Sequence, residues 1–241
     1  MIKQAVILSA GLGARLYPIT DTIPKPMIPI LGKPLLEHHI NQFKKHGVSE
    51  FFISLHYLPE VIRNYFGDGS KWGVKINYSF EPTPLGTAGG VKQFENQLDD
   101  TFFLIYGDIF SLVDYSKMKE VFTAKTDAIG MQRVGLCGYR SDVDLVELDS
   151  DNLFAKIHPK PHSARIGNPY SMRGIFILKR RILSYVPKGV YYEIGSQLLP
   201  DIVSQGEKFY GYECDEYSKG IDTLDKYEEV QNFYKENIGL I

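Results

Sequence analysis

Short apolar runs alternate with segments of helical periodicity over the first 110 residues of the 241-residue chain, and this alternation constrains the fold most strongly. The apolar runs predict strands at residues 3–9, 50–56, 74–80 and 102–106. Helical spacing, with Pro at the start or Gly at the end, predicts helices at 34–46, 58–66 and 87–98. Strands that alternate with helices form a mostly parallel sheet, so we expect an α/β fold with a doubly wound, Rossmann-like sheet.

The alternation loosens after Asp114. Further strands are predicted at 128–134, 145–148, 154–157, 171–178 and 209–213, with a hairpin turn at 149–152 between the second and third of them. Further helices are predicted at 114–124, 196–205 and 223–236. No repeat, low-complexity tract or linker separates the two parts. We therefore expect one α/β domain over residues 1–241, with halves at 1–113 and 114–241 and a β region inserted in the second half.

Composition and charge argue against several classes of protein. The apolar fraction of 44% and the charged fraction of 23% are those of a globular protein, and no stretch approaches the roughly 20 apolar residues of a membrane span. The first residues enter an apolar strand without a signal-peptide pattern, so we expect a cytoplasmic protein that does not act at a membrane. A net charge of -2, with Lys and Arg spread along the chain, argues against a nucleic-acid partner. A homo-oligomer remains compatible with these properties.

A glycine-rich loop follows the first strand and reads Ser9-Ala10-Gly11-Leu12-Gly13-Ala14-Arg15. Glycines allow backbone N–H groups to approach phosphate oxygens, and an arginine adds a planar cation with several donors. A dinucleotide-binding loop would have a third glycine where Leu16 stands, and a Walker loop would have Ser or Thr where Pro34 stands. The loop therefore predicts polyphosphate binding, although a tight turn with a surface arginine also fits this motif alone.

Further along, the chain carries a lysine between two prolines, Pro24-Lys25-Pro26. Together with the glycine-rich loop, this motif resembles the opening of the sugar 1-phosphate nucleotidyltransferases, the family that makes GDP-mannose, dTDP-glucose and related donors. More segments match the family in order, at 81–90, 106–108, 159–161, 173–176 and 220–223. The resemblance covers nearly the whole chain. It implies an enzyme of the EC 2.7.7 type that joins a sugar 1-phosphate to a nucleoside triphosphate and releases pyrophosphate.

The resemblance also implies a role for each matching position. Arg15 would hold the leaving pyrophosphate and Lys25 the α-phosphate and the attacking phosphate, because phosphoryl transfer needs cations that offset crowded negative charge. Asp108 and Asp222 would bind Mg²⁺, the expected cofactor. The nucleotide would contact Ser9, Ala10, Gly11, Leu12, Gly13, Ala14, Glu81, Gly86 and Thr87, all in the first half of the chain. The sugar phosphate would contact Lys160, Arg173, Gly174 and Glu193, all in the second half.

Several of these assignments have a structural alternative. A solvated surface lysine is the alternative for Lys25, although the two prolines fix its backbone. A turn or helix cap is the alternative for Asp108. Asp222 also fits a cap, because Thr223 opens a predicted helix there.

Glu81 bears on the choice of base, because a carboxylate can accept two hydrogen bonds from the N1–H and N2–H₂ edge of guanine. This favours GTP, with a solvated loop residue as the alternative for Glu81. The chain departs from the family at Pro159, where a glutamate is usual, at Arg173, where a small residue is usual, and at Tyr106, where an asparagine is usual. Arg173 could add a cation near the acceptor, so the acceptor need not be ordinary glucose or mannose phosphate.

The chain most resembles the heptose 1-phosphate and mannose 1-phosphate guanylyltransferases, which implies a place in cell-surface polysaccharide synthesis, such as that of capsule or lipopolysaccharide. One alternative is a nucleotidyltransferase that uses CTP or UTP with a different phosphorylated acceptor. Another is a metal-dependent glycosyltransferase, which would not need Arg15 or Lys25 for a leaving pyrophosphate. A non-catalytic nucleotide-sugar binder is a further alternative, since a fold can bind without reacting.

Overall fold

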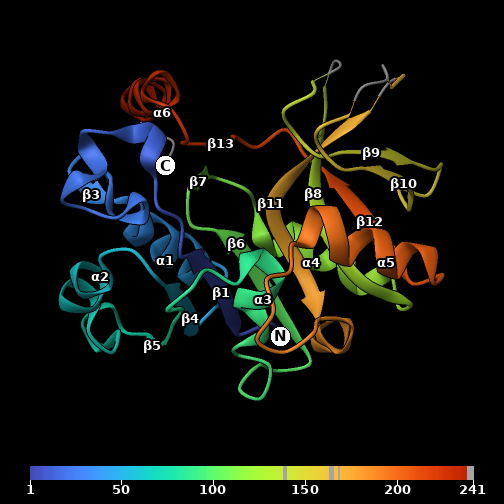
Figure 1. Cartoon of the computed structure of the whole chain (residues 1–241), viewed down its shortest axis with the longest axis horizontal. Coiled ribbons are helices and arrows are strands. Elements are labelled where there is room, and N and C mark those ends of the chain that lie inside the picture. The colour runs from blue at the N-terminus through green and yellow to red at the C-terminus, as the bar shows by residue number, and fades with distance from the viewer. Residues whose placement is uncertain (138–139, 163–165, 168, 238–241) are drawn as a thin grey trace. The chain divides into compact units, whose positions relative to one another are not determined.

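A computed structural model describes residues 1–137, 140–162, 166–167 and 169–237 of the chain (Figure 1). The chain forms two compact units. The first unit comprises Met1–Pro84, Ile105–Tyr115 and Glu216–Ile241, and the second comprises Leu85–Leu104 and Ser116–Asp215. These units do not test the functional halves expected at 1–113 and 114–241, so this functional division stays a prediction. Within the described ranges, no helix is long and apolar enough to cross a membrane.

Parallel strands form the centre of the first unit. Strand β4 (Glu50–Leu55) lies between β1 (Gln4–Ser9) and β5 (Lys75–Phe80), with Gln4 opposite Glu50 and Glu50 opposite Lys75. The end of β6 (Thr101–Tyr106) lies on the other side of β1. The apolar residues of β1 and β4 are buried, as expected of parallel strands that are covered on both faces. The predicted α/β fold with a mostly parallel sheet is therefore confirmed.

The helices of the first unit follow the predicted periodicity. They are α1 (Leu35–Lys45), α2 (Pro59–Phe66) and α6 (Leu224–Glu236). Helix α1 buries Leu36, Ile40 and Phe43, the positions whose spacing predicted it. Helix α6 begins after Thr223, whose hydroxyl accepts a hydrogen bond from the backbone of Lys226.

Several short elements of the first unit were not predicted. They are the antiparallel pairs β2 (Pro29–Ile30) with β3 (Lys33–Pro34) and β7 (Ile109–Ser111) with β13 (Ser218–Gly220), and the 3₁₀ turns η1 (Ala14–Leu16), η2 (Ile19–Asp21), η3 (Lys25–Met27) and η4 (Ser70–Trp72). Each of them has only two or three residues, too few for a periodic pattern. Helix α6 lies beside the β2–β3 pair, where the side chains of Tyr227 and Gln231 donate to the carbonyl of Pro29 (Figure 1).

The second unit contains mainly antiparallel strands. These are β8 (Ala128–Leu136), β9 (Leu145–Leu148), β10 (Phe154–His158), β11 (Tyr170–Lys179) and β12 (Lys208–Glu213), the last of which pairs with β8 in parallel. The helical segments are α3 (Gly86–Lys92), the part of α4 (Tyr115–Ala124) after Tyr115, η5 (Arg180–Tyr185), the π-helical turn η6 (Ile194–Leu198) and α5 (Leu199–Ser204). The predicted hairpin turn is confirmed, because Asp149 accepts backbone hydrogen bonds from Asp151 and Leu153. Helix α3 is shorter than predicted, since it ends at Lys92.

Candidate functional site

The glycine-rich loop at the end of β1 folds back onto Lys25. Gly13 has a φ of 68°, in the left-handed region that favours glycine. A Cβ at Gly13 would lie 3.1 Å from Cγ2 of Thr20 and 3.2 Å from Cβ of Lys25. The hydroxyl of Thr20 donates to the carbonyl of Gly13 at 2.9 Å, which closes the loop. A glycine is needed here because the backbone runs so close to Lys25.

A second glycine, Gly107, places Asp108 beside the end of β1. Its backbone N–H donates to the carbonyl of Leu8 at 2.8 Å. A Cβ at Gly107 would lie 2.6 Å from that carbonyl oxygen and 2.9 Å from Oγ of Ser9. Asp108 therefore lies just after the carboxyl end of β6, beside the end of β1. In open α/β sheets, ligands bind at the carboxyl ends of the strands.

Lys25 and Asp108 form an ion pair. The Nζ of Lys25 lies 2.5 Å from Oδ2 of Asp108, and the lysine side chain is only 12% exposed. The alternative of a solvated surface lysine is therefore wrong for Lys25.

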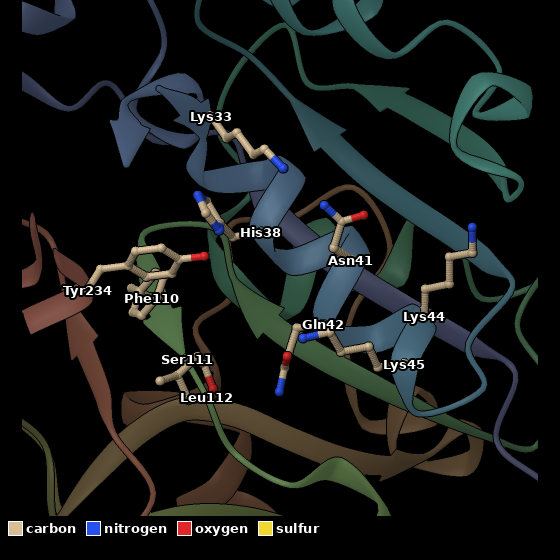
Figure 2. Close-up of a pocket in the computed structure, with 10 residues that line it drawn as sticks. All are labelled: Lys33, His38, Asn41, Gln42, Lys44, Lys45, Phe110, Ser111, Leu112 and Tyr234. Atoms are coloured by element: carbon tan, nitrogen blue, oxygen red, sulfur yellow. The ribbon is translucent and has the colours of Figure 1, made fainter. Parts of the chain in front are cut away.

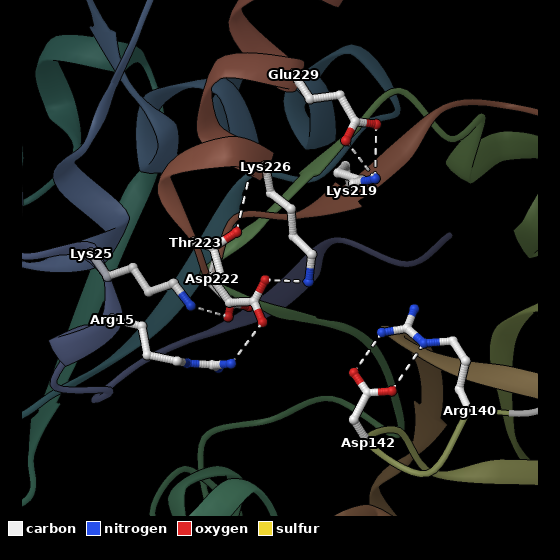
Figure 3. A network of polar contacts seen from close by, with 10 residues as sticks. Arg15, Lys25, Arg140, Asp142, Lys219, Asp222, Thr223, Lys226 and Glu229 are labelled. Atoms are coloured by element: carbon white, nitrogen blue, oxygen red, sulfur yellow. Dashed lines mark hydrogen bonds and ion pairs between the residues drawn. The ribbon is translucent and has the colours of Figure 1, made fainter.

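Asp222 reaches the same region from the far end of the chain. The backbone N–H of Ile221 donates to the carbonyl of Asp108 at 2.8 Å, so the two aspartates are joined through their backbones. Figure 3 shows the Asp222 carboxylate between two cations, with Arg15 at 3.0 Å and Lys226 at 2.5 Å. The predicted phosphate-binding cations and metal-binding aspartates thus lie together within the first unit.

A small apolar core anchors these charged residues. Its buried members are Leu16, Ile28, Ile30, Leu35, Phe110, Ile221 and Val230. Leu16 follows Arg15 directly, and Ile221 precedes Asp222. Burial of such side chains, at about 25 cal/mol per Å² of apolar surface, fixes the backbone on which the charges stand. The core brings together segments more than 200 residues apart in sequence.

The charge balance around Asp222 favours its ionised form. Burial alone would raise the pKa of this carboxyl, but the hydrogen bond from Lys226 and the charges of Lys226, Arg15 and Lys25 hold the pKa below its ordinary value. Three cations thus face two carboxylates, which leaves a positive balance suited to a polyphosphate. Sequence reasoning missed Lys226, although its position four residues after Asp222, across a helix N-terminus, was a usable signal.

The donor set fits Mg²⁺ that is shared with phosphates. Asp108 and Asp222 supply hard carboxylate oxygens. Among the described residues, no group of three or more His, Cys, Asp or Glu side chains could hold a metal by itself. Mg²⁺ in phosphate-transferring proteins usually takes one or two carboxylates and completes its shell with phosphates and water, so two aspartates suffice. The cofactor itself stays a prediction.

The remaining nucleotide-binding candidates of the first unit differ in burial. Gly11, Leu12 and Ala14 are exposed, whereas Ser9 is buried. Glu81 is only 2% exposed, and its backbone is fixed by Leu55 and by the ring of His56. A solvated loop residue is therefore wrong for Glu81, while its contact with a base stays a prediction.

In the second unit, Thr87 and Glu193 bind each other. The Thr87 hydroxyl donates to Oε2 of Glu193 at 2.6 Å and accepts from the backbone of Ile194 at 2.7 Å. The other carboxylate oxygen of Glu193 accepts from Tyr191, and this bond, with burial, raises the pKa of Tyr191 to about 12. A Cβ at Gly86 would lie 2.8 Å from the Tyr192 carbonyl oxygen, so this glycine has a packing role as well as its predicted ligand role.

Asp144 connects the predicted sugar-phosphate residues of the second unit. Its carboxylate accepts from the backbone N–H of Lys160 at 3.0 Å, and its carbonyl accepts from Met172, the neighbour of Arg173, at 3.1 Å. A Cβ at Gly195, two residues after Glu193, would overlap with Oδ2 of Asp144. Asp144 was not predicted, because nothing in its spacing pointed to these partners.

A pocket of about 530 Å³ lies in the first unit. Its lining includes Lys33, side chains of α1 and β7, and Tyr234 of α6, and none of the predicted site residues. Figure 2 shows His38, Phe110 and Tyr234 gathered on one side, where their rings meet edge to face. We assign the candidate active site to the charged cluster rather than to this pocket, because only the cluster combines cations with paired carboxylates.

Comparison with solved structures shows the same fold. HddC from Yersinia pseudotuberculosis superposes with a TM-score of 0.80 at 24% identity, over 97% of this chain and 100% of that one. A putative glucose-1-phosphate thymidylyltransferase from Bacillus anthracis gives a TM-score of 0.84 at 19% identity, over 95% and 94% of the two chains.

Relatives in sequence carry related names. The UTP–glucose-1-phosphate uridylyltransferase of a Synechocystis species is 33% identical over 88% of this chain, and the mannose-1-phosphate guanylyltransferase of Mycobacterium tuberculosis is 30% identical over 91%. The chain spans only 58% and 61% of the lengths of these two relatives. The D-glycero-α-D-manno-heptose 1-phosphate guanylyltransferase of Aneurinibacillus thermoaerophilus is 29% identical over 95% of this chain and 96% of its own length.

The sequence model of the family described as nucleotidyl transferase matches residues 4–237. This match covers both units, and it includes Arg15, Lys25, Asp108 and Asp222. The chain therefore belongs to the nucleotidyl transferase family.

Proposed function

We propose that the protein transfers a nucleoside monophosphate from a nucleoside triphosphate to a sugar 1-phosphate and releases pyrophosphate. Residues 1–113 bind the triphosphate, with GTP favoured, and residues 114–241 bind the sugar phosphate. Heptose 1-phosphate and mannose 1-phosphate are the favoured acceptors, for the synthesis of cell-surface polysaccharides. Relatives named for heptose and mannose 1-phosphate support this choice.

One observation carries the proposal. Two cation–carboxylate pairs, Lys25 with Asp108 and Arg15 with Asp222, lie in one unit and are joined through the backbone of Ile221. Cations and metal-binding carboxylates in one place are what a triphosphate requires, because its charge must be offset before an anionic nucleophile can approach.

The chemistry is an in-line displacement at the α-phosphorus. An oxygen of the sugar phosphate forms a bond to the α-phosphorus, and the bond from this phosphorus to the bridging oxygen of the β-phosphate breaks. The electron pair leaves with pyrophosphate, and no proton transfer is needed. Arg15, which is 71% exposed, has room to bind the leaving pyrophosphate, while the less exposed Lys25 holds the α-phosphate.

Asp108 and Asp222 would hold Mg²⁺ in this scheme. When bound, the ion neutralises phosphate charge and helps to orient the reacting groups. The hydrogen bond from Lys226 lowers the pKa of Asp222 against the effect of burial, and it also occupies Oδ1 of this carboxylate. A divalent cation would therefore compete with Lys226 for that oxygen.

Glu81 supports guanine as the base. A buried carboxylate distinguishes guanine, which offers two adjacent donors, from uracil and thymine, which do not offer that pattern. The relative from Synechocystis is named for UTP, so UTP is the main competitor.

The test is product identification. The protein is incubated with Mg²⁺, one of the common triphosphates and a pool of sugar phosphates, pyrophosphate is assayed, and new diphosphates are identified by mass. We expect pyrophosphate and a GDP-linked sugar. In a parallel incubation with a nucleotide sugar, release of free nucleoside diphosphate would instead indicate a glycosyltransferase, and binding without any turnover would indicate a nucleotide-sugar binder.

A further inference from the structure

Two arginines of the second unit lie on facing strands where the pairing is irregular. In the register of β11 against β8, Met172 pairs with Val134 and Phe176 with Gln132, so three residues of β11 stand opposite Arg133 alone. Arg173 is the first of these three. A bulge of this kind changes the direction of a side chain and is often found beside functional sites. The side chain of Gln132 donates to the carbonyl of Arg173 at 2.6 Å and thereby stabilises the irregular backbone.

Both guanidinium groups are at least partly buried. Among the described residues, Arg173 has no acidic partner. Arg133 is only 7% exposed, and Arg173 is half-buried. Within the described part of the chain, the Arg173 side chain makes no hydrogen bond or ion pair, and its Nε is fully buried. Burial, and then the charge of Arg133, lowers the pKa of Arg173, so the two charges are close enough to repel each other. An arginine nevertheless stays protonated at physiological pH.

Other arginines of the same unit have carboxylate partners. Arg140 forms two hydrogen bonds with Asp142, at 3.0 and 2.6 Å, and Arg181 contacts Glu207 at 2.5 Å. Both of these arginines are more exposed than Arg133, and so need a partner less. A buried charge is costly unless an opposite charge or several hydrogen bonds compensate it. The lack of an acidic partner for Arg173 among the described residues therefore points to an anion that comes from outside the chain.

We propose that Arg133 and Arg173 form an anion subsite for a second negatively charged group of the acceptor, in addition to its 1-phosphate. This inference rests on the proposed function. The predicted ligand of the 1-phosphate is Lys160, whose loop is held by Asp144, and Asp144 also binds the residue before Arg173. A planar guanidinium matches a carboxylate or a phosphate through two parallel hydrogen bonds. This inference replaces plain heptose or mannose 1-phosphate, which the names of relatives favour, with a sugar 1-phosphate that also bears a carboxylate or a second phosphate.

The first experiment measures binding without turnover. Isothermal titration of the full chain compares glucose 1-phosphate with glucose 1,6-bisphosphate and with glucuronic acid 1-phosphate, at constant ionic strength. We expect the better of the two doubly anionic ligands to bind at least about tenfold more tightly than glucose 1-phosphate, as a charge-assisted bidentate contact provides. The doubly anionic ligand with the larger gain in affinity shows whether the second group is a phosphate or a carboxylate.

Variants assign the preference to this subsite. Arg173→Met should reduce the preference to less than about threefold, whereas Arg181→Gln, which also removes an arginine from this unit, should keep it. Equal binding of all three ligands by the unaltered protein would overturn the proposal. So would a preference that Arg173→Met leaves intact, because the second group would then bind elsewhere.

A stability measurement excludes a merely structural role for Arg173. In buffer without multivalent anions, Arg173→Met should unfold at the same temperature as the unaltered protein or at a higher one, because it removes an uncompensated charge. Inorganic phosphate should raise the melting temperature of the unaltered protein by more than that of the variant, because the cations of the first unit can bind phosphate in both. A variant that is several degrees less stable without phosphate contradicts the inference.

The two proposals fail in different ways. If no pair of substrates releases pyrophosphate but the doubly anionic ligands still bind through Arg173, the transferase assignment is wrong and the anion subsite stands. If pyrophosphate is released with singly anionic acceptors and binding shows no preference, the transferase assignment stands and the subsite is wrong.

Discussion

Replacement of Gly107 by alanine tests how closely the position of Asp108 depends on the end of β1. The new Cβ would lie 2.6 Å from the carbonyl oxygen of Leu8. Relief to 3.0 Å, the closest approach of real Cβ atoms, requires a movement of 3.0 − 2.6 = 0.4 Å, and relief to an ordinary contact at 3.4 Å requires 0.8 Å. Leu8 belongs to a central strand, so the segment that carries Asp108 has to move instead.

A movement of this size should affect activity and stability together. A misplacement of about 1 Å in an active site can cost roughly 100-fold in rate, so we expect kcat/KM to fall about 10- to 100-fold. Overpacking of this kind costs about 1–3 kcal/mol, which lowers the melting temperature of a chain of this size by roughly 2–12 °C. The assays are pyrophosphate release under saturating Mg²⁺ and thermal unfolding followed by circular dichroism.

Gly220→Ala is the matched control. Gly220 lies two residues before Asp222, and a Cβ there would meet nothing within 4 Å. This variant should keep the activity and melting temperature of the unaltered protein to within about threefold and 2 °C. If Gly107→Ala behaves like Gly220→Ala, the reasoning that the packing of Gly107 positions Asp108 is refuted.

Three further predictions concern charged and titratable groups around the same cluster. Asp222→Asn should lower turnover at least about 100-fold without loss of cooperative unfolding, and an unchanged rate would remove Asp222 from the metal site. The Lys226→Met variant should bind Mn²⁺ more tightly than the unaltered protein in the absence of nucleotide, because the substitution frees an oxygen of Asp222. Binding is measured by electron paramagnetic resonance, and weaker binding by the variant would contradict a competition between Lys226 and the metal. The free energy of unfolding of the variant should change by less than about 1 kcal/mol. Burial lowers the pKa of His39 from 6.5 to about 4, so the unfolded chain binds a proton there that the folded protein does not. Stability should therefore fall as the pH falls from 6.5 to 4, by roughly 3 kcal/mol at most, and denaturant titrations of His39→Gln should lack this component.

Periodicity predicted the longer elements well. The alternation of apolar runs gave β1, β4, β5 and β6 to within about two residues, and the spacing of Leu36, Ile40 and Phe43 gave α1. The β7–β13 pair was not predictable, because a pair of three-residue strands more than 100 residues apart leaves no periodic signal. This pair nevertheless determines where Asp222 lies.

The site was partly predictable for a similar reason. Arg15 and Lys25 stand in motifs with unusual Gly and Pro spacing, and Asp108 follows a recognisable strand, so the sequence predicted them as site residues, and in the structure they form ion pairs. Arg133 and Asp144 carry no motif, and their importance comes from the partners that folding brings to them. The glycine at position 86 was predicted to admit a ligand, and folding adds a second reason, because the Tyr192 backbone approaches it closely.

Transfer of a labelled α-phosphate tests the central claim most directly. The protein is incubated with Mg²⁺, GTP labelled at the α-phosphorus and a pool of sugar phosphates, in parallel with Lys25→Met. We predict that the label moves into a GDP-linked sugar, that unlabelled pyrophosphate appears in equal amount, and that the variant loses most of this transfer. Label that remains in GTP or appears in free GDP, or transfer that proceeds unchanged in Lys25→Met, would contradict the account.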